Sequence, residues 1–213
     1  MVARDYGQYD GVTRGLELVG ERWALLIVRD LLVGPRRYGE LAAGLPRIPS
    51  NILASRLKEL QDAGVIRRAP RSRVVVYELT PYGRELEPIV LALGAWGFKA
   101  MGDPRDEQII TPDAMTVSLR TAFRPQVALS LPSTAYGAHF GSAELLIRVD
   151  GSTLDVTRED GPVDLAFAAG PDIRRLISGE LPPDRAIESG VIEVLHGSGE
   201  LLGRFADTFH LAA

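Results

Sequence analysis

The chain has 213 residues, of which 46% are hydrophobic and 24% are charged, and its formal net charge is −4. This composition is that of a globular protein and excludes a disordered one, and the length fits one large domain or two small ones. Because the sequence contains no cysteine, a disulfide framework, a zinc–thiolate site, a thiol nucleophile and a thiol redox sensor are all excluded.

The beginning of the sequence, MVARDYGQYD, has no apolar core and is not a signal peptide. The longest apolar run, Trp23–Val28, is far shorter than the ~18 residues that span a bilayer. We therefore expect a cytoplasmic protein with no membrane partner.

The charge is distributed unevenly along the chain. Residues 1–100 contain 15 basic and 11 acidic side chains, a net of +4, whereas residues 101–213 contain 9 and 17, a net of −8. The segment from Arg36 to Arg73 has nine basic residues against three acidic ones. A local net charge of +6 in an acidic chain is typical of a surface that neutralises phosphates.

The first half reads as helices followed by a hairpin and another helix. Asp10 can cap a helix that ends near Gly20, and helices are then predicted at 23–33, at about 38–43 and from 49–51 to Gly64. Residues 65–68 and 74–79 are β-branched runs around a basic tip at 69–73, which predicts a hairpin. Thr80 and Pro81 then begin a helix predicted to reach about Met101, with an apolar stripe at Leu86, Ile89, Val90, Leu93 and Trp96.

A polar break at 102–107 marks the predicted domain boundary, which gives one domain at 1–102 and a second at 108–213. In the second domain we expect a helix from Thr111, strands at 127–131, 144–149, 153–157 and 163–168, and a hairpin turn at Asp150 and Gly151. Helical turns at 172–178 and 183–188, a strand at 191–195 and a last helix at 198–211 complete it. The fold class is therefore α+β.

The helices and basic hairpin of the first half predict a winged helix-turn-helix. The fourth helix of this half has one apolar and one polar face. At ~100° per residue, Leu53, Leu57 and Leu60 fall on one side, and Asn51, Ser55, Lys58 and Asp62 on the other. Polar side chains at the start of such a helix can reach base edges in a major groove. The alternative is an ordinary solvated helix face, but the basic hairpin favours DNA binding. The candidate DNA-binding residues are Arg36, Arg37, Arg47, Ser50, Asn51, Ser55, Arg56, Lys58, Arg71 and Arg73.

Four ordered segments resemble the HxlR-type transcriptional regulators: Asp10–Trp23, Gly34–Leu41, Ala63–Arg68 and Tyr77–Leu86. The resemblance implies a homodimer held through its first and last helices, with each wing on the minor groove or backbone. It also implies a double-stranded DNA operator with two related half-sites. Many redox-sensing members carry a cysteine just before the first helix, where this chain has Asp10, so a signal must reach it another way.

The second half resembles the sterol carrier protein type-2-like domain from Phe167 to Gly197 and into the last helix. The shared pattern is a strand, a helix that ends at Ser178-Gly-Glu-Leu181, a proline-led turn that ends at Ser189-Gly190, and a strand. The resemblance implies a sheet packed by helices around an apolar cavity that holds a hydrophobic small molecule. The candidate lining residues are Phe140, Leu146, Phe167, Leu176, Ile177, Leu181, Phe205 and Phe209; the alternative is that they form a solid core.

The sequence offers little for catalysis, so we expect neither an enzyme nor a cofactor or metal. His139, His196 and His210 lack metal-ligand spacing. Gly197-Ser198-Gly199 could bind an anion, but a serine helix cap explains it more simply. We expect a dimeric DNA-binding regulator whose second domain senses an apolar molecule. The alternatives are a lipid-carrier or enzyme-like second domain, with the first serving dimerisation, and a ligand-free interaction domain.

Overall fold

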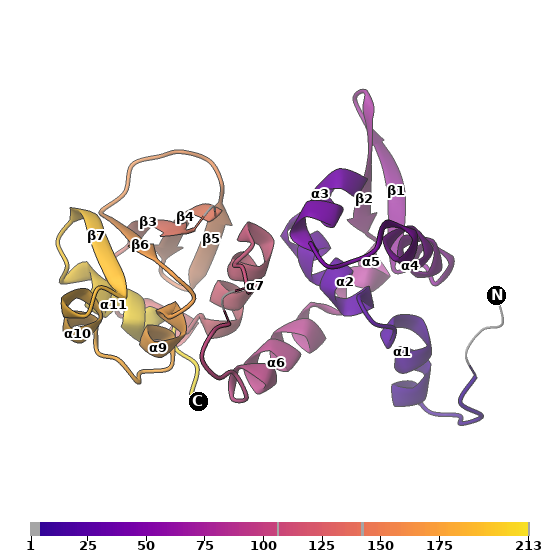
Figure 1. The fold of residues 1–213 in the computed structure, drawn as a ribbon, viewed down its shortest axis with the longest axis horizontal. Coiled ribbons are helices and arrows are strands. Elements are labelled where there is room, and N and C mark those ends of the chain that lie inside the picture. Colours follow the sequence, from indigo (N-terminus) through magenta and orange to yellow (C-terminus); the bar gives the residue numbers. More distant parts are fainter. Residues whose placement is uncertain (1–4, 106, 142, 213) are drawn as a thin grey trace. The chain divides into compact units, whose positions relative to one another are not determined.

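The computed structural model describes residues 5–105, 107–141 and 143–212, and the chain divides into two compact units, 1–90 and 91–213 (Figure 1). Within the described residues, no helix is both long and apolar enough to cross a membrane. The predicted domain limits, 1–102 and 108–213, remain a prediction.

In the described part of the first unit, five helices, the start of a sixth and a two-stranded wing form the fold. Asp10 caps the first helix as predicted, because its carboxylate accepts hydrogen bonds from the backbone N–H groups of Val12 and Thr13 at 2.8 and 3.0 Å. Gly64 ends the fourth helix with a positive φ of 69°. The elements of this unit are α1 (Gly11–Val19), α2 (Ala24–Val33), α3 (Tyr38–Gly44), α4 (Ser50–Asp62), β1 (Ile66–Arg71), β2 (Val74–Leu79) and α5 (Pro81–Arg84), followed by the start of α6 (Glu87–Phe98).

The buried apolar side chains of the first unit come mainly from α2, α4 and the wing, with α2 packed on β2 and α4 on β1. Ile27, Val28 and Leu31 of α2 are buried, as the nearly uniform apolar character of this helix predicts. Leu53, Leu57 and Leu60 of α4 are buried as well, so the predicted inner face of this helix is confirmed. Burial of this stripe fixes which side of α4 is left for solvent.

The wing is longer than predicted and its turn is shorter. The expected tip at 69–73 contributes Ala69, Pro70 and Arg71 to β1, and Arg71 pairs with Val74 across the turn. Ser72 turns the chain with a φ of +55°. A proline fits here because, within the described residues, β1 pairs with β2 alone in a two-stranded sheet, so the missing N–H of Pro70 breaks no second ladder.

The helix predicted from Thr80 to about Met101 is interrupted. It forms α5 and α6, with Leu86 donating its N–H to Gly83 at 3.2 Å, three residues back, as in a tightened last turn. Pro88 explains the break, because it has no N–H to continue the ladder to Arg84.

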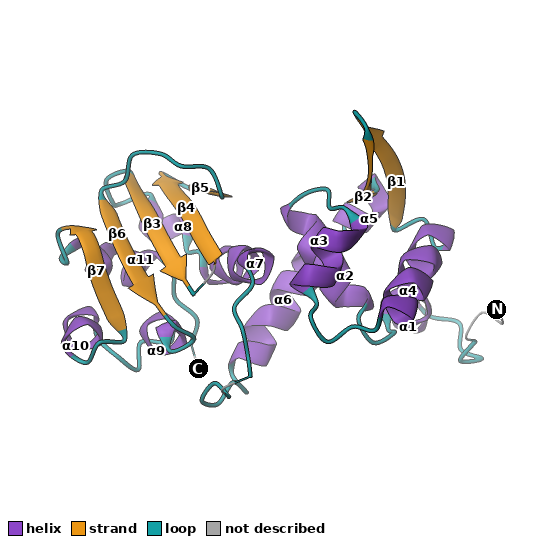
Figure 2. Ribbon diagram, turned by 45° about the horizontal axis from the view of Figure 1, so that its top comes forward, coloured by secondary structure: helices purple, strands orange, loops and turns teal. Residues whose placement is uncertain are grey.

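The second unit is a sheet covered by helices. Among its described residues, five strands run in the order β5-β4-β3-β6-β7, with β3 and β6 parallel and the other neighbours antiparallel (Figure 2). The strands are β3 (Thr134–Phe140), β4 (Ala143–Asp150), β5 (Thr153–Thr157), β6 (Leu165–Ala169) and β7 (Ile192–Gly197). The helices are α7 (Pro112–Ala122), α8 (Pro125–Ala128), α9 (Ile173–Ile177), α10 (Pro183–Glu188) and α11 (Leu201–Thr208).

Two predicted elements of this unit differ from the structure, and one strand of the structure was not predicted. The strand predicted at 127–131 is wrong, because Pro125 begins the helical turn α8 and Ala128 donates to the carbonyl of Arg124 at 3.0 Å. The central strand β3 was not predicted, since its small residues dilute the apolar alternation. The last helix is shorter than 198–211 and spans Leu201–Thr208.

An aromatic cluster fills the space between the sheet and α11. The ring of Phe205 lies 5.3 Å from that of Tyr136, 5.1 Å from that of Phe167 and 4.7 Å from that of Phe209, centroid to centroid. All four side chains are at most 1% exposed. This core is therefore packed and solid.

Candidate nucleic-acid interface

The start of α4 presents small polar side chains to solvent. Ser50 and Asn51 occupy its first positions and are exposed, and Lys58 lies two turns further on the same side. Tyr38 of α3 donates its hydroxyl to the carbonyl of Ser50 at 2.8 Å, which fixes the beginning of α4 against α3. Tyr38 was not among the predicted site residues.

Two of the predicted α4 residues are tied to acidic neighbours. Arg56 pairs with Glu59 and, at 3.3 Å, with Glu21, and its side chain is 12% exposed. Ser55 donates to Glu59 at 2.9 Å. Arg56 lies beside the buried stripe of α4, whereas Ser55 lies on the outer face but is half-buried and bonded to Glu59.

Lys58 is the most exposed of the basic side chains on α4. Its ammonium lies 3.2 Å from the Asp62 carboxylate, and both side chains are well exposed. A pair of this kind holds a lysine weakly, so Lys58 can exchange Asp62 for another anion.

The wing carries a row of arginines organised by one carboxylate. Glu78 of β2 accepts hydrogen bonds from Arg67 at 2.8 Å and from Arg71 at 3.1 Å. These two hydrogen bonds hold the pKa of Glu78 below its ordinary value. Arg67 stands opposite Glu78 in the strand register, so the cross-strand pair could have been found from the hairpin sequence. Glu78 was missed because charge was counted along the chain and not across the hairpin.

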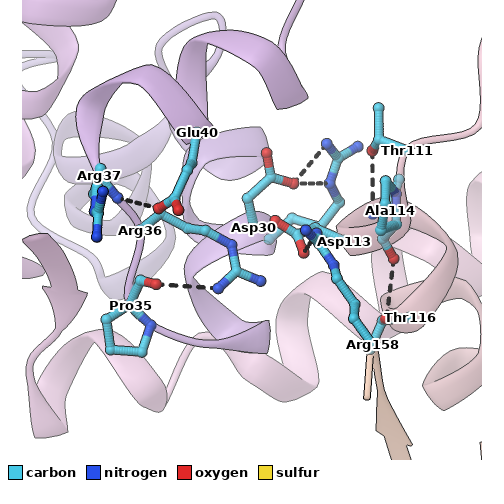
Figure 3. Close-up of polar contacts among 12 residues, drawn as sticks. Asp30, Pro35, Arg36, Arg37, Glu40, Thr111, Asp113, Ala114, Thr116 and Arg158 are labelled. Carbon is cyan, nitrogen blue, oxygen red and sulfur yellow. Dashed lines mark hydrogen bonds and ion pairs between the residues drawn. The ribbon is translucent and has the colours of Figure 1, made fainter. Parts of the chain in front are cut away.

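Arg73 lies at the turn of the wing and is exposed. It lines a hollow of about 580 Å³ together with Arg37 and Glu40 at the start of α3 and Arg71 in β1. The backbone N–H of Arg37 donates to Glu40 at 2.6 Å, which closes the first turn of α3 (Figure 3). The hollow therefore joins the α3 start to the wing.

Arg36 anchors the wing through its backbone. Its N–H donates to the carbonyl of Tyr77 at 3.0 Å, and its carbonyl accepts from the N–H of Tyr77 at 2.7 Å. The side chain of Arg36 bends back and donates to the Pro35 carbonyl at 3.0 Å (Figure 3). Arg47 is exposed in the segment between α3 and α4.

The ten residues predicted to bind DNA thus fall into two groups, and the exposed Arg47 joins the first of them. Ser50, Asn51, Lys58, Arg37, Arg71 and Arg73 are exposed around the start of α3, the outer face of α4 and the wing. Ser55, Arg56 and Arg36 are partly buried and make contacts within their own unit. The predicted small-molecule site of the second unit is not formed as expected.

Seven of the eight predicted cavity-lining residues do not line the large cavity of the second unit. Phe140, Phe167, Leu176, Phe205 and Phe209 lie in the packed core and are at most 1% exposed. Leu146 is buried and Leu181 is partly buried against the same core. Ile177 is the one predicted residue found among the lining of this cavity, which has a volume of about 690 Å³.

The second unit has a buried acidic group of its own. Asp113, at the start of α7, is 5% exposed and accepts a hydrogen bond from Arg158 at 2.6 Å (Figure 3). Within the described residues, no group of three or more His, Cys, Asp or Glu side chains has the arrangement of a metal site.

Comparison with known proteins points to one family. The family model described as HxlR-like helix-turn-helix matches residues 18–104. HTH-type transcriptional regulator Rv3095 of Mycobacterium tuberculosis is 40% identical over 114 residues, which are 52% of this chain and 66% of that relative. HTH-type transcriptional regulator YvaP of Bacillus subtilis is 37% identical over 86 residues, which are 39% of this chain and 80% of that relative.

Solved structures match a similar share of the chain. The HTH-type regulator ytcD is 38% identical and is aligned over 43% of this chain and 96% of its own, with a TM-score of 0.40. Quinone-bound YodB from B. subtilis is 34% identical over 41% of this chain and 96% of its own, with a TM-score of 0.38. With identity above a third across most of a relative's length, the chain belongs to the HxlR-like helix-turn-helix family.

Proposed function

We propose that the protein is a DNA-binding transcriptional regulator that acts as a homodimer on a double-stranded operator. One observation carries the proposal: the exposed start of α4 and the arginine-bearing wing belong to the same unit, in a segment with a net charge of +6. The printed names of the relatives, HTH-type transcriptional regulators, support it.

In this proposal α4 is the recognition helix. Its inner stripe is buried, so Ser50 and Asn51 lead an exposed face that can enter a major groove. An asparagine can make two hydrogen bonds to an adenine edge, and a lysine such as Lys58 can reach a phosphate. Ser55, Arg56 and Arg36 then support this face, while Arg47 remains a candidate for phosphate contact.

The wing supplies the second DNA contact. Arg71 and Arg73, with Arg37 across the hollow, give guanidinium groups that suit phosphate oxygens or a narrow minor groove. The carboxylate of Glu78 holds Arg71 in place through a hydrogen bond of 3.1 Å.

Gel shifts at fixed salt with a selected operator test the DNA contacts. We expect Asn51→Ala to cost ~1–3 kcal/mol and to relax the base preference at one position in each half-site. Arg71→Ala and Arg73→Ala should weaken binding to all sequences alike. Arg185→Ala, which removes an exposed arginine of the second unit paired with Glu188, is the control and should leave affinity unchanged. Unchanged affinity in all three wing and helix variants would refute the proposed docking.

Exposed apolar side chains on two helices support the proposed dimer. Val12 and Leu16 of α1 are 76% and 50% exposed, one helical turn apart. Along α6, Ile89, Leu93 and Trp96 are exposed at spacings of four and three residues, with Trp96 at 72%. Apolar stripes on two helices favour burial against a second copy, and a two-fold dimer matches an operator with two half-sites.

Sedimentation velocity tests the dimer. We expect Trp96→Ser to shift the protein toward the monomer and to weaken operator binding along with it. Tyr82→Ser is the control, because Tyr82 is also exposed but lies in α5, outside both stripes. A Trp96→Ser protein with the wild-type sedimentation coefficient would refute this interface.

For the second half we propose a sterol carrier protein type-2-like domain over residues 108–213 that binds an apolar small molecule and is preceded by a DNA-binding domain at 1–102. The succession of β6, α9, α10 and β7 supports the likeness, since it is the order of elements that the resemblance implies. Native mass spectrometry of protein expressed in cells tests it. A bound apolar molecule that is lost on denaturation is expected.

One observation favours the second candidate function, a ligand-free interaction domain: most of the predicted lining residues are packed in the core. The absence of a bound molecule, together with no thermal shift across a panel of lipids, would favour the ligand-free interaction domain.

A further inference from the structure

The cavity of about 690 Å³ lies wholly within the second unit. The C-terminal half of α6, the segment that follows it, α7 and α9 form its walls (Figure 1). Its volume is within the range of small-molecule sites, ~300–1,000 Å³. It is separate from the aromatic core between the sheet and α11, and it shares Ile177 with the predicted site.

Two glycines of α6 shape this space. A Cβ on Gly94 would lie 3.3 Å from the hydroxyl of Thr121 in α7, so this glycine lets the two helices approach. A Cβ on Gly97 would meet no atom within 4 Å. The space beside Gly97 is therefore unfilled. A glycine at this position destabilises the helix by ~1 kcal/mol relative to alanine, and no steric contact requires it.

Large apolar side chains of the wall are left in contact with solvent. Met101 and Ile109 line the cavity and are 54% and 63% exposed, and Leu93, which also belongs to the proposed dimer stripe, is 46% exposed. Phe98, Ile173 and Ile177 add further apolar surface behind them. An apolar body seated in the cavity would cover this surface, which is the main source of affinity in sites of this kind.

The Arg174 guanidinium, which is 12% exposed in the wall, favours an anionic head group on the ligand. Among the described lining residues, the charged ones are Arg105, Arg174 and Asp103, and the Asp103 carboxylate lies 3.9 Å from the Arg174 guanidinium. Glu180 holds the Arg174 guanidinium in place with hydrogen bonds of 2.6 and 3.2 Å. Among the described residues, the Nε of Arg174 is buried with no acceptor, so the guanidinium still has an unused donor.

We propose that this cavity is the effector site, and that it binds an amphipathic small molecule with an apolar body and a single anionic head oriented by Arg174. The site adjoins the helix of the proposed dimer. At ~100° per residue, Gly94, Gly97 and Met101 lie on one side of α6 and its continuation, about a third of a turn from Ile89 and Trp96. The term effector rests on the proposed function. Binding of the ligand to the cavity does not depend on it.

Isothermal titration of the full chain with decanoate below its micelle concentration, in the absence of DNA, tests the site. We expect the wild type to bind decanoate and Gly97→Leu to weaken binding at least tenfold, because the new side chain occupies the cavity. Ser118→Leu, on the α7 wall, should act in the same way and serves if Gly97→Leu does not fold. Gly203→Leu is the matched control: its Cβ also meets no atom within 4 Å, but it lies in α11, outside the lining.

The head group is tested with Arg174→Met and with decanol as the neutral counterpart of decanoate. Loss of a hydrogen bond to a charged group corresponds to about tenfold or more in Kd, so the variant should bind decanoate on the order of tenfold more weakly and decanol as before. An equal effect on both ligands would overturn the role of Arg174.

No binding of decanoate to the wild type, or an unchanged Kd in Gly97→Leu and Ser118→Leu, would overturn the site itself. Operator binding by the same proteins without ligand is measured in parallel. If the wild type does not bind the operator, the proposed function is refuted but the cavity site is not. The two failures are therefore distinguishable.

Discussion

At the scale of single residues, Asp10 is a helix cap at a position where the resemblance would place a cysteine. In the resemblance to HxlR-type regulators this is the position of the redox-sensing cysteine, and here its carboxylate caps α1. Hydrogen bonds from Thr13, first from its hydroxyl and then from its N–H, hold the pKa of Asp10 below the ordinary value. A residue in this role stabilises a helix and has no redox chemistry.

Glu78 is expected to stabilise the wing in a pH-dependent way. Its pKa is lowered by Arg67 and Arg71, so its contribution is present above the unfolded value of about 4.3 and is lost as the pH falls through the folded value. In urea unfolding, Glu78→Gln should therefore be less stable than the wild type from pH 8 to about pH 5. The two should converge in more acidic solution. The exposed Glu85, replaced in the same way, provides the control; a gap that stays constant to pH 3 would contradict the prediction.

Tyr136 should make the second unit sensitive to alkali. Burial of its ring raises the pKa of the phenol to about 12, so the neutral form stabilises the fold below the unfolded value of about 10. That stability, on the order of 2 kcal/mol, is lost as the pH rises from about 10 to 12. Tyr136→Phe keeps the ring and removes the titration, so urea unfolding at pH 9 and 11 should show a smaller loss than in the wild type. An equal loss would contradict this.

At the scale of elements, local sequence signals predicted the helices well but did not predict the central strand, whose formation depends on pairing within the sheet. Caps and glycines at Asp10, Gly64 and Thr111 gave the limits of α1, α4 and α7 because these signals act within a few residues. The strand β3 lies in the middle of the sheet, yet it contains Gly137 and two alanines. Its pairing with β4 and β6 comes from residues distant in sequence, which no local window contains.

The helix α11 is expected to hold the second core through Phe205. This ring is fully buried and contacts Tyr136, Phe167 and Phe209. Phe205→Ala should lower the free energy of unfolding of the second unit by ~3–5 kcal/mol, because it removes apolar contacts and leaves a void. Asp207→Ala, on the exposed side of α11, is the control in the same urea titration. A loss below about 1 kcal/mol would mean that the core relaxes around the change.

At the scale of the whole molecule, charge separates the two halves more clearly than composition does. The first hundred residues have a net charge of +4 and the remainder −8. A polyanion is attracted to the first and repelled by the second. A net charge of −4 for the whole chain is therefore a poor guide to whether it binds DNA.

The salt dependence of operator binding should report the basic surface. The logarithm of the affinity falls with the logarithm of the salt concentration by about 0.9 for each phosphate neutralised. Arg73→Ala should reduce this slope by about 2 in a dimer, one contact in each subunit. The slope is measured by fluorescence anisotropy between low and physiological salt, with Arg185→Ala as the control. An unchanged slope would show that Arg73 makes no phosphate contact.

The sequence by itself determined the helical first half, the basic wing, the inner and outer faces of α4 and the absence of a thiol sensor. These follow from periodicity, capping and composition, which act locally. The tertiary structure decided that Glu78 organises the wing arginines, that Arg56 is tied to Glu21 and Glu59, and that the predicted lining phenylalanines form a solid core. It also located the cavity beside Gly97. A buried apolar residue looks the same in sequence whether it faces a neighbour or an empty space, because the difference depends on side chains brought together from distant parts of the chain.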